Sequence, residues 1–305
     1  MSQCICGHHG KFSYPLLPQS LCSKCFTLKF EKEVLKHIPR SIRGYPIAIS
    51  LSGGKDSSTL LHILNKYQRK LRIPQLYAFV LEEGIPEIQD ERQKVINEFK
   101  KSYSKIIFIE KSYFDLFGQT LPNLVQLSDN KGLRFTPCAI CGILRRHAIL
   151  RLSLKNPVNF VIMGTTLNDE AETLLLNILR GQPEKNLRHQ VNYQASDGKY
   201  IPQRIKPLSR VIEQKIRTYC SIHDLGVVSI QCPFSNRSLR YQINIFLSKV
   251  EKKTPHVFYN ILSSVNKSKI INTRIKKVQR CIKCNSYSIE PECPACRLVA
   301  QIISS

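Results

Sequence analysis

Residues 45–58 read YPIAISLSGGKDSS, and this stretch decides the fold. The apolar run up to Leu51 is typical of a buried strand, and the residues from Ser57 to about Leu71 follow a helical pattern. Gly53 and Gly54 stand between the two, where the lack of a Cβ lets backbone N–H groups approach an anion closely. The following helix N-terminus adds free donors and a positive dipole end. The stretch therefore predicts a phosphate-binding loop.

The side chains of this loop fit the same chemistry. Lys55 supplies a point charge for phosphate, and Ser52 and Ser57 supply hydroxyl groups. The glycine–lysine spacing of a Walker loop is absent, so the loop belongs to another class of nucleotide-binding protein. A structural turn with chance glycines is the alternative interpretation.

Strands and helices are expected to alternate through the middle of the chain. Further strands are predicted at Gln75–Leu81, Ile106–Ile109, Val158–Met163 and Val227–Ile230. Helices are predicted at Gln89–Ser102, at Asp169–Arg180 with Gly181 as the C′ residue, and at Val211–His223. Alternation of this kind predicts an α/β fold with a doubly wound parallel sheet that helices cover on both faces.

Two cysteines are expected in the first turns of a helix that runs to about Leu154. Thr136 is a good N-cap and Pro137 suits the first helical position. Cys138 and Cys141 then share one helix face, and the helix N-terminus favours their thiolates. Such a pair is able to bind part of an iron–sulfur cluster, form a redox pair or carry a persulfide. Half of a structural zinc site is the alternative.

Cys232 follows the predicted strand Val227–Ile230 and is a candidate third member of this group. A buried small apolar side chain is the alternative for this residue.

The remaining paired cysteines lie near the two termini. Cys281 and Cys284, followed by Cys293 and Cys296, have the spacing of a zinc ribbon, since two knuckles satisfy a tetrahedral ion. Near the N-terminus, Cys22 and Cys25 form one such knuckle. Its partner is irregular, because only one residue separates Cys4 from Cys6, and His8 and His9 are alternative ligands for the fourth position.

Composition limits the class of protein. The formal net charge of +24 favours a polyanionic partner such as nucleic acid, although a surface of solvated lysines is the alternative. No run of 18 apolar residues exists, so no membrane span is expected. The N-terminal residues lack the apolar core of a secretory signal, and paired cysteines without one favour metal ligation in a reducing, cytoplasmic compartment.

The order of these motifs resembles that of the cytoplasmic tRNA 2-thiolation proteins, which are pyrophosphate-loop ATPases of the TtcA/TtuA type. The similar strings are Leu21–Phe26 running into Phe30–Leu35, Ser52–Ser57, Asp115–Gly118, Cys138–Arg146, Lys206–Leu208 with Cys232, and the C-terminal ribbon. The resemblance implies an ATP pyrophosphatase fold, of the adenine nucleotide alpha hydrolase type, flanked by small zinc modules at both termini.

The resemblance also implies an activity: adenylation of the 2-oxygen of a wobble uridine, followed by sulfur transfer. It implies that ATP and Mg²⁺ are handled by Ser52, Gly53, Gly54, Lys55, Asp56, Ser57, Val80, Gly164 and Asp169. Lys55 and Asp56 are implied as catalytic, together with Cys138, Cys141 and Cys232, which hold a 4Fe-4S cluster or carry a persulfide. Implied zinc ligands are the terminal cysteines. Implied partners are tRNA, a ubiquitin-like sulfur carrier as sulfur donor, and a second thiolation subunit or a second copy of the chain.

The chain departs from the family pattern in its second nucleotide motif. The family reads GHNxDD where this chain reads GTTLND over residues 164–169, so only Asp169 remains of the acidic pair. An expected aspartate is Gln182, an expected glycine is Tyr241 and an expected arginine is Asn244. Alternatives are therefore a catalytically weakened zinc-ribbon subunit that binds tRNA, or another ATP pyrophosphatase such as a lysidine synthetase.

Four segments are expected along the chain: a zinc module over residues 1–30, the pyrophosphate-loop domain over 31–265, a basic linker or RNA-facing helix over 266–280, and a zinc ribbon over 281–305.

Overall fold

A central sheet of five parallel strands organises the computed structural model of this chain. The structure describes residues 3–13, 20–183, 185–186, 192–198, 200–267 and 275–304. The strands stand in the order β3-β2-β1-β4-β6. Their bounds are β1 Ile47–Leu51, β2 Leu76–Glu82, β3 Ile107–Ser112, β4 Phe160–Ile162 and β6 Gln203–Ile205.

The register of the sheet brings the ends of these strands to one edge. Ile49 of β1 pairs with Ala78 of β2 on one side and with Ile162 of β4 on the other, and every pair is parallel. The strand order reverses at β1, which is the switch point where open α/β sheets bind their ligands. The residues that follow β1, β2 and β4 therefore meet in one place.

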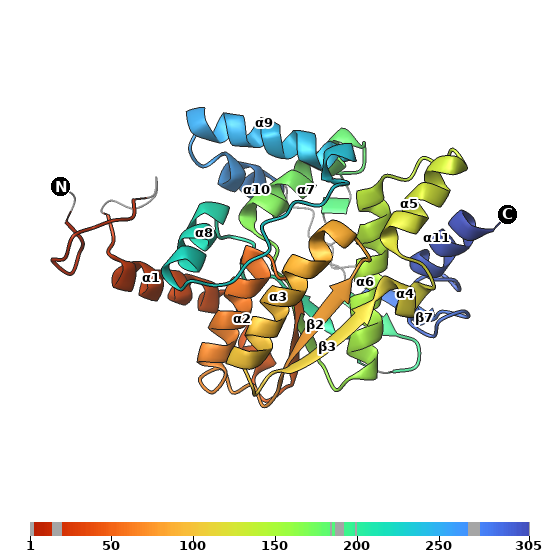
Figure 1. Cartoon of the computed structure of the whole chain (residues 1–305), viewed down its shortest axis with the longest axis horizontal. Coiled ribbons are helices and arrows are strands. Elements are labelled where there is room, and N and C mark those ends of the chain that lie inside the picture. The colour runs from red at the N-terminus through yellow and green to blue at the C-terminus, as the bar shows by residue number, and fades with distance from the viewer. Residues whose placement is uncertain are drawn as a thin grey trace.

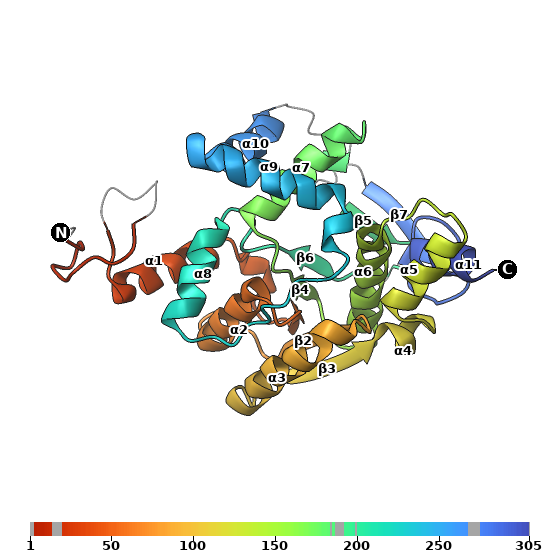
Figure 2. The same cartoon turned by 45° about the horizontal axis from the view of Figure 1, so that its top comes forward.

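Helices cover both faces of the sheet, as the alternation of elements predicts (Figures 1 and 2). One apolar core lies beneath α2 (Lys55–Tyr67), α3 (Pro86–Ser102) and α8 (Glu213–Ile222), and α1 (Ser23–Lys36) packs against α8. The other core lies beneath α6 (Pro137–Lys155). Burial from both sides explains why β1, β2 and β4 read as nearly continuous apolar runs, whereas the edge strands β3 and β6 are more exposed and more polar.

The other elements lie around this three-layer body. Next to α6 are α4 (Tyr113–Phe117), α5 (Leu121–Asn130) and α11 (Pro294–Ile303). A separate group at the top of Figure 1 holds α7 (Leu167–Leu179), α9 (Leu239–Lys253) and α10 (Val257–Lys267). A small second sheet contains β5 (Asn192–Ala195), β7 (Ile275–Arg280) and β8 (Tyr287–Ser288). Two short 3₁₀ helices are η1 (Arg40–Ile42) and η3 (Ser235–Arg237).

The prediction of a strand at Val227–Ile230 is wrong. That stretch has no regular secondary structure, and the fifth strand is β6, which precedes Lys206. The backbone here does not pair with a strand of the sheet; the Val228 N–H donates to the carbonyl of Gly53 at 2.8 Å instead. The segment therefore crosses the phosphate loop.

The expectation for Asn266–Arg280 also needs correction. Helix α10 extends to Lys267, residues 268–274 lie outside the described part, and Ile275–Arg280 form strand β7 instead of a linker or a helix. β7 pairs with β5 and β8, which gives its basic residues an ordered backbone.

Among the described residues, no helix has both the length and the apolar character that crossing a bilayer needs.

Candidate active site

The phosphate loop joins β1 to α2 through two glycines. Gly53 has a φ of +79°, a conformation that L side chains rarely adopt, and a Cβ there would lie 2.9 Å from Val228 Cγ2. The Ser57 hydroxyl donates to the Gly54 carbonyl at 3.1 Å and accepts from the Ser52 N–H at 3.2 Å. These bonds hold the loop around the start of α2, where its first N–H groups are free for an anion.

Lys55 and Asp56 form a charged group with a residue from a distant part of the chain. Lys55 Nζ lies 3.1 Å from Asp56 Oδ2 and 3.2 Å from Glu213 Oε1. Burial opposes the charge on Lys55, but the two carboxylates outweigh it and hold the pKa of Lys55 above its ordinary value. The lysine is therefore a fixed cation at the mouth of the loop.

Asp56 is suited to binding a metal cation in addition to its pairing with Lys55. Burial raises its pKa to about 6; Lys55 opposes this shift, and Asp169 and Glu213 add to it. Its Oδ1 is buried and has no hydrogen-bond partner among the described residues. An orphaned carboxylate oxygen beside two more carboxylates fits a Mg²⁺ ion, which takes oxygen ligands.

The second nucleotide motif, residues 164–169, packs against the phosphate loop and contributes to the starts of two helices. Gly164 packs against the loop so closely that a Cβ would lie 3.1 Å from the Ser57 nitrogen. Thr166 caps α7 and exchanges hydrogen bonds with Asp169 in a capping box. Asn168 Oδ1 accepts from the Glu213 N–H at 3.1 Å, so it caps α8 as a carboxylate would. The substitution at residue 168 removes a charge but retains the acceptor.

Arg240 of α9 lies across the first turns of α7. Its Nη2 is 3.2 Å from Asp169 Oδ1 and its Nε is 2.9 Å from Glu172 Oε2. Asn244 Nδ2 donates to the other oxygen of Glu172 at 2.5 Å. The departure at residue 244 thus leaves a satisfied, nearly buried Glu172 and a fixed Asp169.

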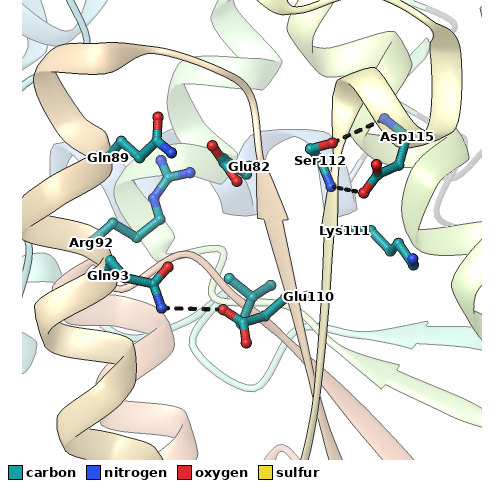
Figure 3. Close-up of a pocket in the computed structure, with 9 residues that line it drawn as sticks. Glu82, Gln89, Arg92, Gln93, Glu110, Lys111, Ser112 and Asp115 are labelled. Atoms are coloured by element: carbon teal, nitrogen blue, oxygen red, sulfur yellow. Dashed lines mark hydrogen bonds between the residues drawn. The ribbon is translucent and has the colours of Figure 1, made fainter.

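Val80 lines a polar cavity of about 220 Å³ beneath α3. Figure 3 shows Gln89, Arg92 and Gln93 projecting from the helix toward Glu82 and Glu110. The cavity adjoins the phosphate loop, since Arg92 Cγ lies 3.6 Å from the place that a Cβ on Gly53 would take. Arg92 Nε is buried and lacks a hydrogen-bond partner among the described residues, which leaves a donor for a ligand.

The central cysteines lie at the start of α6, as the sequence predicts. Thr136 caps the helix through the Ala139 N–H, and Pro137 takes the first position. Cys138 is exposed and Cys141 is half-buried, with the Tyr113 hydroxyl donating to the Cys141 carbonyl at 3.1 Å. The pair is therefore accessible to solvent at the N-terminus of α6.

Cys232 lies close enough to these two thiols to interact with them. Burial raises the pKa of Cys232, and the charges of Cys141 and Cys138 raise it further. The structure therefore groups three cysteines from two distant segments. Their sulfurs do not form one of the tight ligand groups found in the described residues, where all ligand atoms lie within 4.8 Å of one another.

A buried carboxylate connects the cysteine helix to the phosphate-loop side. Glu83, 3% exposed, accepts from Arg145 Nη2 at 2.6 Å and also pairs with Arg92. Burial opposes its charge, but Arg145 and Arg92 hold the pKa of Glu83 below its usual range. The negative charges of Cys141 and Glu83 in turn raise the pKa of Arg145. Arg145 thus places a permanent positive charge beside Cys141.

The N-terminal cysteines converge as a four-sulfur group. Cys4, Cys6, Cys22 and Cys25 form it, which supports cysteine over histidine for the fourth position, although Cys6 Sγ also lies 3.4 Å from His8 Nδ1. Cys6 Sγ lies 3.5 Å from Cys4 Sγ and 3.6 Å from Cys22 Sγ. Tetrahedral zinc with 2.3 Å bonds needs sulfurs about 3.8 Å apart. The donor set fits zinc.

The C-terminal cysteines form the second such group, from Cys281, Cys284, Cys293 and Cys296. Cys284 and Cys293 sulfurs lie 3.6 Å apart, and Arg151 Nη2 donates to Cys296 Sγ at 3.5 Å. Arg151 belongs to α6, so this module rests on the helix that carries the central cysteines. All twelve cysteines lie in the described part of the chain, and all are free thiols.

The sequence did not single out two residues of this site. Glu213 reaches Lys55 from α8, and Glu83 reaches Arg145 from the end of β2. Neither residue belongs to any of the sequence motifs through which the chain resembles a known family. The only available signal for Glu83 was its place directly after an apolar strand.

Comparisons with known proteins agree with this arrangement. Residues 27–253 match the family described as the PP-loop domain. The cytoplasmic tRNA 2-thiolation protein 1 of Drosophila melanogaster is 30% identical over 300 residues, which cover 96% of this chain and 85% of that protein. A probable sulfurtransferase of Methanocaldococcus jannaschii is 27% identical over 298 residues, covering 96% and 86%.

Among solved structures, the U34-tRNA thiolase NcsA from Methanococcus maripaludis with its 4Fe-4S cluster has a similar fold. The TM-score is 0.81 at 24% identity, over 99% of this chain and 97% of that one. The matched PP-loop domain and the 30% identity along nearly the whole length place this chain in the PP-loop family and, within it, among the cytoplasmic tRNA 2-thiolation proteins.

Proposed function

We propose that this protein is an ATP-dependent tRNA sulfurtransferase that replaces the 2-oxygen of a wobble uridine with sulfur. One observation carries the proposal: a phosphate-binding loop and three solvent-accessible cysteines are tied to the same edge of one sheet. The Val228 N–H bond to Gly53 links the loop to the Cys232 segment, and Glu83 links Arg92 to Arg145. The names of the relatives support tRNA as the substrate and thiolation as the reaction.

ATP binds with its phosphates over the loop Ser52–Ser57, and the ammonium group of Lys55 pairs with their negative charge. Asp56, with Asp169 nearby, would hold Mg²⁺, an ion that takes oxygen ligands. The nucleoside part extends toward Val80 and Gly164, and the cavity that Arg92 lines offers it polar groups. The uridine 2-oxygen attacks the α-phosphate, the bond to the β-phosphate breaks, and pyrophosphate leaves. A sulfur nucleophile then forms the C–S bond and AMP leaves with the oxygen.

The three central cysteines form the site of sulfur transfer. Cys138, Cys141 and Cys232 would hold a 4Fe-4S cluster, which supplies an iron with an open position for a transferable sulfide. Arg145 keeps a positive charge beside Cys141. Each terminal group of four cysteines would hold a structural zinc ion, because four thiolates leave no open position on the metal.

The alternative of a catalytically weakened subunit is less well supported. Asn168 retains the capping acceptor, and Asp169 is held by Thr166 and Arg240. Glu213 adds a carboxylate near Lys55. The site therefore keeps the charges that nucleotide and magnesium need.

The family's partners complete the proposal. We expect a ubiquitin-like sulfur carrier as the donor and either a second thiolation subunit or a second copy of this chain, acting in the cytoplasm like the relatives. A basic surface suits tRNA.

The test is a reaction of anaerobically purified protein with tRNA, ATP, Mg²⁺ and sulfide. Mass spectrometry of the digested tRNA should detect 2-thiouridine at the wobble position, with one AMP and one pyrophosphate formed per sulfur. A tRNA with cytidine at that position is the matched control. Formation of AMP without thiouridine, or lysidine formed from added lysine, would refute the assignment.

A further inference from the structure

We propose that Glu91 is a positioning residue that fastens the segment carrying Cys232 across the phosphate loop, so that bound nucleotide controls the access of solvent to this thiol. The inference rests on the proposed function only in taking Cys232 as a working thiol. It concerns the stretch Gly226–Ile230, which has no regular secondary structure. Its backbone N–H groups form hydrogen bonds with a side chain and with the phosphate loop instead of with a neighbouring β-strand.

Glu91 supplies the acceptors that this stretch lacks. One oxygen of its carboxylate accepts from the Ser229 N–H at 3.1 Å and from the Ser229 hydroxyl at 2.6 Å. The other accepts from the Ile230 N–H at 3.0 Å. Both segment residues are exposed, so without Glu91 their N–H groups would turn to water and the chain would be free to move. One carboxylate on α3 therefore fixes two successive residues.

The same segment is bonded to the phosphate loop. The Val228 N–H donates to the Gly53 carbonyl at 2.8 Å, and Val228 Cγ2 occupies the space that a side chain on Gly53 would need. At its start, Gly226 passes so close to α3 that a Cβ would lie 2.8 Å from Glu98 Oε2. Any movement of the loop on phosphate binding would therefore be passed directly to Val228.

Beyond Ile230 the segment leads to Cys232 and is held again. The Cys232 carbonyl accepts from the Ser235 N–H at 3.0 Å, and Arg237 of η3 pairs with Asp129 of α5 at 2.8 Å. Cys232 thus lies between a fixed point at η3 and a fastened point at Ile230, only two residues away. Release of the Glu91 end would leave the Val228 bond to Gly53 as the nearest fixed point before Cys232, and the half-buried thiol would open more often.

The experiment measures the alkylation of Cys232 by iodoacetamide in zinc-loaded, iron-free full-length protein, with peptide mass spectrometry to separate it from the other thiols. The wild-type rate should fall when a non-hydrolysable ATP analogue and Mg²⁺ are added. In Glu91→Ala, Cys232 should react roughly three to ten times faster, because charge-assisted hydrogen bonds are lost, and nucleotide should no longer slow it. The buried Cys220 serves as an internal reference for global unfolding.

Two variants separate positioning from general stability. Glu91→Gln keeps an oxygen for Ser229 but turns an amide N–H₂ toward the Ile230 N–H, so its rate should be intermediate. Asp90→Ala changes the exposed neighbour on the same helix and should react like the wild type. An unchanged Cys232 rate that still responds to nucleotide in Glu91→Ala overturns the proposal, as does a rise shared by Cys220. Failure of wild-type protein to thiolate tRNA would refute the proposed function instead, without altering these rates.

Discussion

Arg145 Nη2 lies 2.6 Å from Glu83 Oε1, which joins the helix of the central cysteines to the end of β2. The other oxygen of Glu83 pairs with Arg92, which reaches the phosphate loop. One buried carboxylate thus holds two cations that face different parts of the site.

Glu83→Gln should destabilise the protein by about 2–4 kcal/mol, because two arginines lose a buried countercharge. The folded pKa of Glu83 lies below its ordinary value, so its contribution is present above the unfolded pKa and is lost as pH falls through the folded pKa. The stability difference between wild type and variant, measured by denaturant unfolding, should therefore shrink toward pH 3. Glu110→Gln removes an exposed pair with Lys100 and should cost less than about 1 kcal/mol. An equal loss of unfolding free energy in the two variants would contradict the role of Glu83 as a buried bridge between Arg92 and Arg145.

Asp56→Asn should stabilise the nucleotide-free protein at pH 7 by about 1–3 kcal/mol, while weakening Mg²⁺-ATP binding. The folded pKa of Asp56 is raised to about 6, so the folded state holds this proton more tightly than the unfolded chain. That stability is present below the unfolded pKa and is lost as pH rises through about 6. The gain from the substitution should therefore grow between pH 4 and pH 7 in thermal unfolding without nucleotide. A gain that stays constant with pH would contradict the assignment.

Lys55→Ala should abolish adenylation and thiolation and leave the fold intact, because Lys55 is a partly exposed cation of the loop and not part of the core. Formation of AMP from labelled ATP is the measurement, with zinc content and the circular dichroism spectrum as checks on folding. Lys66→Ala, on the far end of the same helix, is a matched change of charge that touches Glu31 instead of the loop. Normal thiolation by Lys55→Ala would show that the loop assignment is wrong.

Cys232→Ser should lose iron and keep zinc. Each terminal group already offers four thiolates, whereas Cys138 and Cys141 alone are too few to hold a cluster. Anaerobic wild-type protein should be brown, and the variant should lose the visible absorption and the iron signal in elemental analysis. Cys220→Ser changes a buried thiol bonded to Thr59 and should retain iron. If wild-type protein contained zinc but no iron after anaerobic reconstitution, the cluster hypothesis would be wrong. A persulfide on one of the central cysteines would then be the remaining route for sulfur transfer.

Binding of tRNA should weaken steeply with salt. From the formal charge of +24 we expect several phosphate contacts, and each neutralised phosphate adds roughly one unit to the log–log slope of affinity against salt. Filter binding from low to physiological ionic strength measures the slope. Affinity that stays flat over this range would count against nucleic acid as the partner.

The sequence by itself determined the fold class, the phosphate loop, the cysteine helix and the two terminal modules. Each depends on short-range order: an apolar strand before glycines, an N-cap with proline at Thr136 and Pro137, and paired cysteines at knuckle spacing. Only the tertiary structure decided that Glu213 joins Lys55, that Glu83 bridges two arginines, and that Gly226–Ile230 crosses the loop instead of forming a strand. Those partners lie far apart along the chain, and what brings them together is packing around a shared core, because no local pattern encodes which distant carboxylate completes a buried cation.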